Sequence, residues 1–270
     1  MPSRLISAGI IAFWLTMTGL LLYQEVVPMM LAEIAPTVTI DLTDEIGSPL
    51  VGWTMYADGK RIGSATSKIN ALEGRAYEFH SAFHFDDDRY LPGLRAIETK
   101  DRVAEDNKLL GMEMKVVFER NNIDIKGDVV DKILKPRLYL NDKEFKDFKL
   151  GEIDMTSQPN VVSSLKLVSR LRGLHEGQTW TETTFDPSSG IKDQFAADLF
   201  KQVRTPSLIA QVKSTTLTWD KKEVGCFLVE YYDAHKDVVA RVWVRKRDGL
   251  VIQREVAVLG KELTLRRIPN

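Results

Sequence analysis

The sequence predicts an α+β protein in which an N-terminal transmembrane helix precedes a large, curved antiparallel β-sheet of half-barrel type, with one or two helices on one face. An uncharged apolar run opens the chain. Most of the remaining sequence alternates between apolar and polar residues, as the strands of a half-buried sheet do. The final third consists of such strands joined by short polar turns, which is typical of an antiparallel meander.

The bulk composition is that of a folded protein. The 270 residues are 44% hydrophobic, enough for a sizeable core in one domain or two small ones. Although 28% of the residues are charged, the net charge is only −1, whereas nucleic-acid-binding proteins usually carry a basic excess. The single cysteine, Cys226, excludes an intramolecular disulfide framework and a Cys-based zinc cluster, and its apolar neighbours indicate a buried thiol.

The first residues have the features of a membrane anchor. No charged residue occurs from Leu5 to Tyr23, and as a helix this run would rise roughly 28 Å, close to the thickness of a bilayer's hydrocarbon core. Arg4 precedes the run, and no Lys or Arg follows it until Lys60, which places the N-terminus in the cytoplasm. We therefore expect residues 1–24 to be a single-pass anchor in the inner (cytoplasmic) membrane and the rest to be periplasmic or otherwise extracytoplasmic.

A cleaved signal peptide is the alternative interpretation of this segment. The apolar region of a signal peptide is usually about 7–15 residues, shorter than this one, but residues 30–35 contain weak cleavage sites. Both interpretations export the domain. Pro28, Pro36 and Pro49 indicate an irregular linker over residues 25–50, followed by a β-rich domain over residues 51–270.

Strand patterns fill the first half of this domain. The alternation is clearest in Tyr77–Phe85, and Asp58-Gly59 between two apolar runs is a strong hairpin signal. Strands are expected at Val51–Tyr56, Arg61–Ile69, Tyr77–Phe85, Ala96–Asp106, Gly111–Glu119, Asn122–Lys126 and Arg137–Leu140.

Helices are predicted between these strands and the C-terminal meander. Apolar residues at helical spacing predict a helix at Asn160–Leu171, with Gly173 as its stop, and a second short helix at Lys192–Val203. The strands of the meander are expected at Gln211–Trp219, Val224–Tyr232, Val238–Lys246, Leu250–Leu259 and Glu262–Ile268.

Candidate catalytic and metal-binding residues are few. His84 and the acidic run after it, Asp86 to Asp88, have metal-ligand character, but a solvated acidic turn is the simpler interpretation. A hydrolase would need His84, His175 or His235 to meet a nucleophile, and the sequence contains no Gly-x-Ser-x-Gly elbow, Walker loop or dinucleotide fingerprint. We therefore expect no catalytic residue, no metal and no cofactor, with a hydrolase as the least favoured alternative.

Two sets of residues are candidates for binding. Aromatic side chains suit either the wall of an apolar cavity or an ordinary core: Trp53, Phe79, Phe83, Phe118, Trp180 and Trp219. Basic residues crowd the terminal strands, and Arg241, Arg245 and Arg254 are candidates for a face that docks anionic lipid headgroups or an acidic partner. The alternative is a solvated outer face on which Glu230, Glu255 and Glu262 balance these arginines across the strands.

One resemblance adds to these observations. The pattern Ala240-Arg241-Val242-Trp243-Val244, followed by Gly249-Leu250-Val251-Ile252 and Leu263-Thr264-Leu265, resembles the last hairpins of the LolA/LolB-type lipoprotein-carrier superfamily. Segments 52–63 and 173–187 also resemble uncharacterised exported bacterial domains. The resemblance implies a curved antiparallel half-barrel, closed by helices over an apolar cavity. The predicted anchor departs from these carriers, which are soluble or lipid-anchored, and favours a fixed domain over a shuttle.

The sequence thus leads us to expect a membrane-anchored, non-enzymatic extracytoplasmic domain that binds a lipid, an acyl chain or a lipoprotein-like ligand. The alternative is a structural or assembly partner in a cell-envelope complex, which would dock through the basic face or an edge strand. The expected partners are the membrane, a lipid or lipoprotein ligand and an envelope protein, with no nucleic acid.

Overall fold

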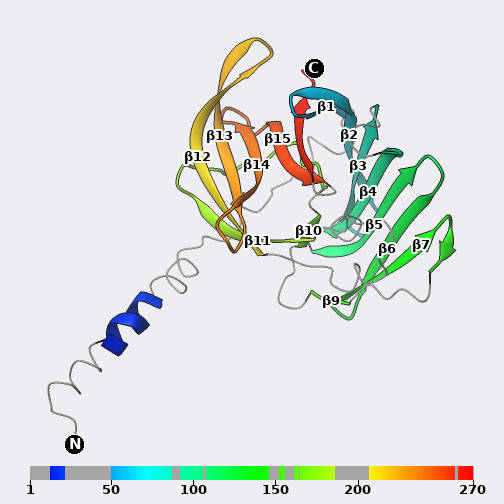
Figure 1. The fold of residues 1–270 in the computed structure, drawn as a ribbon, viewed down its shortest axis with the longest axis horizontal. Helices are drawn as coiled ribbons and strands as arrows, with labels where there is room; N and C mark the ends of the chain where they lie inside the picture. The colour runs from blue at the N-terminus through cyan, green and yellow to red at the C-terminus, as the bar shows by residue number, and fades with distance from the viewer. Residues whose placement is uncertain are drawn as a thin grey trace, which may run out of the picture.

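The computed structural model describes residues 13–21, 50–86, 92–105, 108–145, 152–155, 161–163, 165–185, 207–258 and 261–269. Residues 13–21 are helical, and all other regular structure in these ranges is β (Figure 1). The predicted anchor is described only over residues 13–21, and the predicted linker only at Leu50. Within the described part of the chain, no helix combines the length and the apolar character needed to cross a membrane.

The described strands form one 16-stranded sheet. In chain order they are β1 (Val51–Ala57), β2 (Lys60–Leu72), β3 (Ala76–Phe85), β4 (Leu94–Ala104), β5 (Leu109–Phe118), β6 (Asn122–Val130), β7 (Ile133–Leu140), β8 (Lys143–Glu144), β9 (Ile153–Asp154), β10 (Val161–Ser163), β11 (Thr179–Phe185), β12 (Ser207–Trp219), β13 (Lys222–Tyr232), β14 (Val238–Arg245), β15 (Val251–Val258) and β16 (Lys261–Arg267).

The sheet runs from β10 through β16 to β1 and on to β8, and β9 pairs with β7. Neighbours in this order are antiparallel, except that β10 and β11 are parallel. The join between β16 and β1, with Trp53 opposite Arg267, connects the last strand to the first. Apart from the β16–β1 and β7–β9 pairs, the pairing of the described strands joins strands that are adjacent in the sequence, as a meander requires.

The predicted strands are confirmed in β1–β7 and β12–β16. The Asp58-Gly59 hairpin is also confirmed, with both residues in the left-handed region at φ 48° and 73°, as a two-residue hairpin turn needs. Strands β8 to β11 were not predicted. The described chain is mostly β rather than α+β.

The helix predicted at Asn160–Leu171 is wrong. Val161–Ser163 is strand β10, and residues 165–171 form no helix. Leu165, Leu167 and Leu171 are buried at intervals of two and four residues along an extended chain, which accounts for the apolar spacing that resembled a helix. The second predicted helix, Lys192–Val203, lies outside the described residues.

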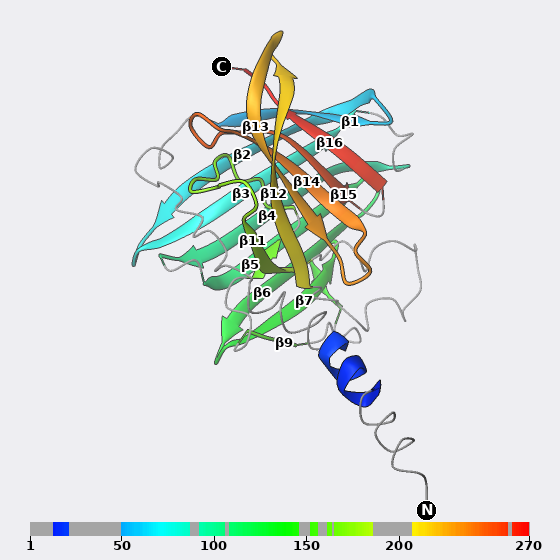
Figure 2. The same cartoon turned by 90° about the vertical axis from the view of Figure 1, so that its left-hand side faces the viewer.

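The sheet curves so that β12–β15 face β3–β6 across the interior (Figures 1 and 2). Both halves bury side chains in one hydrophobic cluster, from Phe83 and Ile97 on one side to Val229 and Val242 on the other. A smaller cluster of Cys226, Leu250 and Ile252 is separate from this core. Among the described residues, the concave face thus carries the larger of the two hydrophobic clusters.

Candidate functional site: the concave face of the sheet

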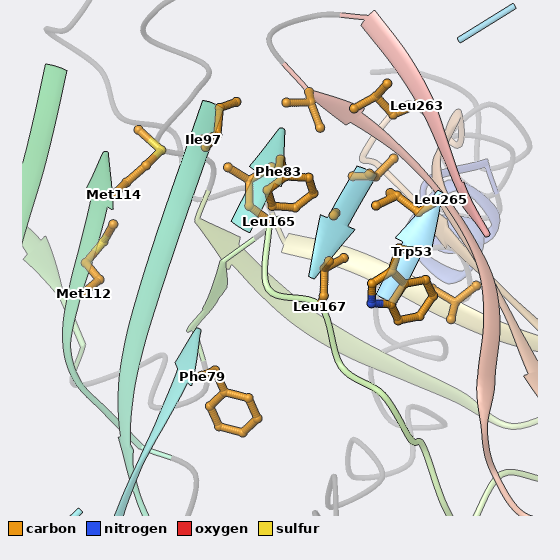
Figure 3. Close-up of a cluster of buried hydrophobic side chains, with 14 of the residues drawn as sticks. Trp53, Phe79, Phe83, Ile97, Met112, Met114, Leu165, Leu167, Leu263 and Leu265 are labelled. Carbon is orange, nitrogen blue, oxygen red and sulfur yellow. The ribbon is translucent and has the colours of Figure 1, made fainter. Parts of the chain in front are cut away.

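Residues 165–171, hereafter the crossing segment, lie over the concave face. Leu165 and Leu167 are almost fully buried, with 1% and 4% of their surface exposed. They project into the same cluster as Trp53, Phe79 and Phe83 (Figure 3). The chain itself therefore covers the apolar wall on which a hydrophobic ligand was expected.

The two ends of the crossing segment are held differently. Its C-terminal end joins the start of β15, because the Leu171 amide donates to the Gly249 carbonyl and the Val251 amide to the Ser169 carbonyl, at 2.8 and 3.0 Å. Its N-terminal end is held by side chains of the sheet. The amide of Leu167 donates to the hydroxyl of Ser81 at 3.1 Å, and the Arg254 guanidinium donates to the Lys166 carbonyl at 2.5 Å.

The crossing segment also carries a cation into the interior. The Lys166 ammonium lies 3.6 Å from the centre of the Phe79 ring, a cation–π contact. Burial raises the pKa of Asp101 to about 6 although the Lys166 cation opposes the shift, and burial lowers the pKa of Lys166. Asp101 Oδ2 and Thr99 Oγ1 on β4 are buried with no hydrogen-bond partner among the described residues.

A second group of ionisable side chains lies on the opposite half of the concave face. Glu182 on β11 hydrogen-bonds with the side chains of Trp180 and Tyr231, and Arg254 lies close enough to interact with its charge. Burial raises the pKa values of Glu182 and Tyr231 and lowers that of Arg254. Two cations and two carboxyl groups thus share the interior, where their opposite charges interact.

Most of the predicted aromatic residues lie on the concave face. Trp53, Phe79, Phe83 and Trp180 are buried in the shared cluster, and Phe118 packs against its edge. Trp219 does not, because it packs against the Cys226 cluster, with its indole Nε1 3.1 Å from the Arg267 carbonyl that accepts its hydrogen bond.

The predicted basic face does not exist as a unit. Arg254 is opposite Val242 in the β14–β15 ladder, and the buried Val242 belongs to the shared core, so Arg254 points inward. Arg241 pairs with Glu230 and Glu255, both at 3.2 Å. This pairing follows the alternative of a balanced outer face. Arg245 makes two hydrogen bonds to Asp248, at 2.8 and 2.6 Å.

The candidate metal ligands and bases lie elsewhere. Within the described ranges, no three His, Cys, Asp or Glu side chains are grouped so that they could hold a metal ion. Asp86 pairs with Arg61 at 3.6 Å, and Asp87 and Asp88 lie outside the described residues. His84, His175 and His235 are exposed on β3, in the loop before β11 and in the β13–β14 turn.

Comparisons with known proteins give a structural likeness only. No family profile and no curated protein matches the sequence. The fold resembles a β-barrel-like protein of a domain of unknown function (DUF1849) from Brucella abortus, with 14% identity and a TM-score of 0.44 over 81% of this chain and 94% of that one. It also resembles the hypothetical lipoprotein YmcC from Escherichia coli, with 13% identity and a TM-score of 0.33 over 87% of this chain and 98% of that one. Neither likeness identifies a function.

Proposed function

We propose that this chain is a membrane-tethered, non-enzymatic extracytoplasmic domain that binds a lipid or another acyl-chain ligand on the concave face of its sheet. The observation that carries the proposal is the crossing segment. Leu165 and Leu167 occupy the apolar wall as an acyl chain would. They lie between two points of strand pairing, that of β10 with β11 and the bridge of Arg170 to Leu250, and hydrogen bonds to the side chains of Ser81 and Arg254 hold this stretch on the sheet.

The burial energies of the segment's leucines and of an acyl chain are comparable. Burying a leucine side chain contributes about 1.5–3 kcal/mol, so two leucines contribute about 3–6 kcal/mol. An acyl chain gains about 0.8 kcal/mol for each buried methylene, so a chain that buries about eight methylenes matches or exceeds the two leucines. In hydrophobic burial alone, a ligand of ordinary acyl length therefore matches Leu165 and Leu167. The ligand must also offset the hydrogen bonds that Ser81 and Arg254 make to the segment.

The predicted anchor and the sequence resemblance support the same function. A tether at residues 1–24 would hold the domain within reach of the membrane, which raises the effective concentration of a lipid ligand without new contacts. The resemblance of the C-terminal strands to lipoprotein carriers agrees with an apolar ligand.

A reversible cross-link tests the exchange. The amide nitrogen of Leu167 lies 3.1 Å from the hydroxyl oxygen of Ser81, which makes S81C and L167C a pair to cross-link the segment to β3, and thiol titration checks that the disulfide has formed. The double variant, in a Cys226→Ala background, is titrated with a fluorescent fatty acid before and after reduction. We expect binding only by the reduced form, because the disulfide holds the segment on the wall.

The reduced form of the same protein is the matched control, since it carries every substitution. Equal binding by the oxidised and reduced forms would show that no exchange occurs. Native mass spectrometry of the unmodified full chain after mild extraction provides an independent measurement. A chain that always emerges without bound lipid and does not bind the fatty acid would refute the proposal.

A second candidate function, docking within an envelope complex, rests on the β12–β13 hairpin. Pairing between β13 and β14 ends at Cys226, and pairing between β11 and β12 ends at Gln211. The Gly225 carbonyl still accepts a hydrogen bond from the Lys246 amide at 3.0 Å. The described strands therefore leave the hairpin tip, residues 217–224, without a strand neighbour on either edge. Such an edge can accept a strand from another protein. Site-specific crosslinking from Thr218 would trap a defined protein in this case, whereas lipid binding on the concave face predicts no defined protein adduct at this position.

A further inference from the structure

A groove of about 400 Å³ opens where the crossing segment leaves the sheet. Leu171 and Leu174 form one apolar side and Phe227 on β13 the other. Arg172, Lys246 and Arg247 also line the groove, so positive charge surrounds these apolar side chains.

More cations than carboxylates line this groove among the described residues. Asp248 is the carboxylate among the described residues that line it, and both of its oxygens accept hydrogen bonds from Arg245. The Arg247 guanidinium lies 3.9 Å from the same carboxylate, farther away than that of Arg245, and the Arg247 side chain is 78% exposed. The Lys246 ammonium lies 2.9 Å from the Ser214 hydroxyl and 5.0 Å from the centre of the Phe227 ring. That hydroxyl in turn donates to the Glu176 carboxylate at 2.5 Å. Four cations of the lining are thus set against Asp248 in the groove and Glu176 beside it.

The two walls of the groove are fixed to each other. Gly249 has φ of 70°, and a Cβ at this position would lie 2.5 Å from the Leu171 carbonyl oxygen, so only glycine allows this close approach. The Leu171 amide donates to the Gly249 carbonyl at 2.8 Å, and Asp248 accepts from the Leu250 amide at 3.3 Å. The cations of the β14–β15 turn are thus held beside Arg172 of the segment.

The apolar side chains of the groove also contact the core under the concave face. Leu171 is the last residue of the crossing segment and belongs to the shared core, and Phe227 packs against that core. A ligand whose chain replaces the leucines of the crossing segment would have this groove at the segment's C-terminal end, next to the same core.

We propose that this groove binds the phosphate headgroup of an anionic amphiphile. Guanidinium groups bind phosphate oxygens through paired hydrogen bonds, and the ammonium of Lys246 adds a point charge. The position of the acyl chain rests on the proposed function, whereas the binding of phosphate by the groove does not.

The test compares three probes on the full chain in zwitterionic nanodiscs, by calorimetry with empty nanodiscs as blank. The probes are an octanoyl lysophosphatidic acid, an octanoyl monoacylglycerol and glycerol 3-phosphate. The variant carries R172Q, K246Q and R247Q. The matched control carries K60Q, K126Q and K135Q, which remove equal charge from exposed positions elsewhere on the sheet.

We expect the anionic amphiphile to bind at least about tenfold more tightly than the neutral one, with a preference that weakens at high salt. The groove variant should lose this preference and still bind the neutral probe, while the control keeps it. Equal affinity for the two amphiphiles in the native chain, or an unchanged preference in the groove variant, would overturn the inference.

Glycerol 3-phosphate separates this inference from the proposed function. If neither amphiphile binds, the proposed function fails. Binding of glycerol 3-phosphate that is lost in the groove variant would then assign the groove to free phosphate esters, and absence of that binding would refute the groove as well. If both phosphate probes bind equally tightly, the chain contributes nothing and the ligand is a free phosphate ester rather than a lipid headgroup.

Discussion

The ammonium group of Lys166 lies over the ring of Phe79, 3.6 Å from its centre, inside the curved sheet. The contact brings the crossing segment and β3 together from positions 87 residues apart in the sequence. It also explains how an apolar interior accepts a cation, because the ring face and the nearby Asp101 replace part of the lost hydration.

Asp101 should make the stability of the domain depend on pH. Its pKa is about 6 in the folded chain against an ordinary 3.8, so the folded state binds the proton more tightly. Stability should therefore fall as pH rises from about 4 to about 6, by up to about 3 kcal/mol. Urea unfolding between pH 4 and 7 measures this slope, and Asp101→Asn should flatten it.

The pKa of Glu182 is also raised, so Glu182 makes stability fall with rising pH as Asp101 does. This contribution is present in both the native chain and the Asp101→Asn variant. The relevant quantity is therefore the difference between the two profiles. Parallel profiles for the native chain and Asp101→Asn would contradict the assignment.

Glu230 should have the opposite effect. Burial tends to raise its pKa, but hydrogen bonds from Lys213, Tyr232 and Arg241 lower it overall. Because the folded pKa is depressed, the stabilisation is present above the ordinary pKa near 4.5 and is lost as pH falls through the lower folded value. Glu230→Gln should cost roughly 1–3 kcal/mol at pH 7. Its cost should shrink in acid, and a cost that stays constant from pH 7 to pH 3 would refute this account.

The sequence predicted the strands well because each is a local pattern. The exceptions are instructive. Strand β6 extends to Val130 and β7 begins at Ile133, well beyond the predicted limits, because Asp131 and Lys132 form the turn with φ of 52° and 63° and no glycine marks it. Strands β8 to β10 contain only two or three residues each, too few to show a period.

The candidate site was predictable only in part. Alternation placed Phe79 and Phe83 on one face, but the burial of Leu165 and Leu167 depends on residues far away in the sequence. The Leu167–Ser81 hydrogen bond, for example, spans 86 positions. The side of the sheet on which Arg254 lies could not be predicted from alternation. The register shifts between Trp243 and Val244, so the alternation of inward and outward residues in β14 does not carry over to β15.

Gly63 tests the packing between β1, β2 and β3. A Cβ on Gly63 would overlap the carbonyl oxygen of His84 and lie 2.8 Å from Met55 Cε. Gly63→Ala should therefore lower the unfolding free energy of the domain by about 1–3 kcal/mol through overpacking. Gly225→Ala is the control, because its Cβ would meet nothing closer than Lys246 Cδ at 3.9 Å. Equal melting temperatures for the two variants would contradict the predicted contact.

Ser81 links the stability of the domain to the proposed ligand exchange. Ser81→Ala removes the acceptor of the buried Leu167 amide, which should cost about 1–3 kcal/mol of unfolding free energy. If a ligand replaces the crossing segment, the weaker attachment of the segment should raise apparent ligand affinity about fivefold for each 1 kcal/mol lost from it.

Ser67→Ala is the matched control, because Ser67 accepts a comparable buried hydrogen bond from the Trp53 indole at 3.2 Å, within the sheet. Both variants should melt earlier, and only Ser81→Ala should bind the fluorescent fatty acid more tightly. Tighter binding by both would point to general loosening of the sheet, and tighter binding by neither would mean that the segment stays in place when the ligand binds.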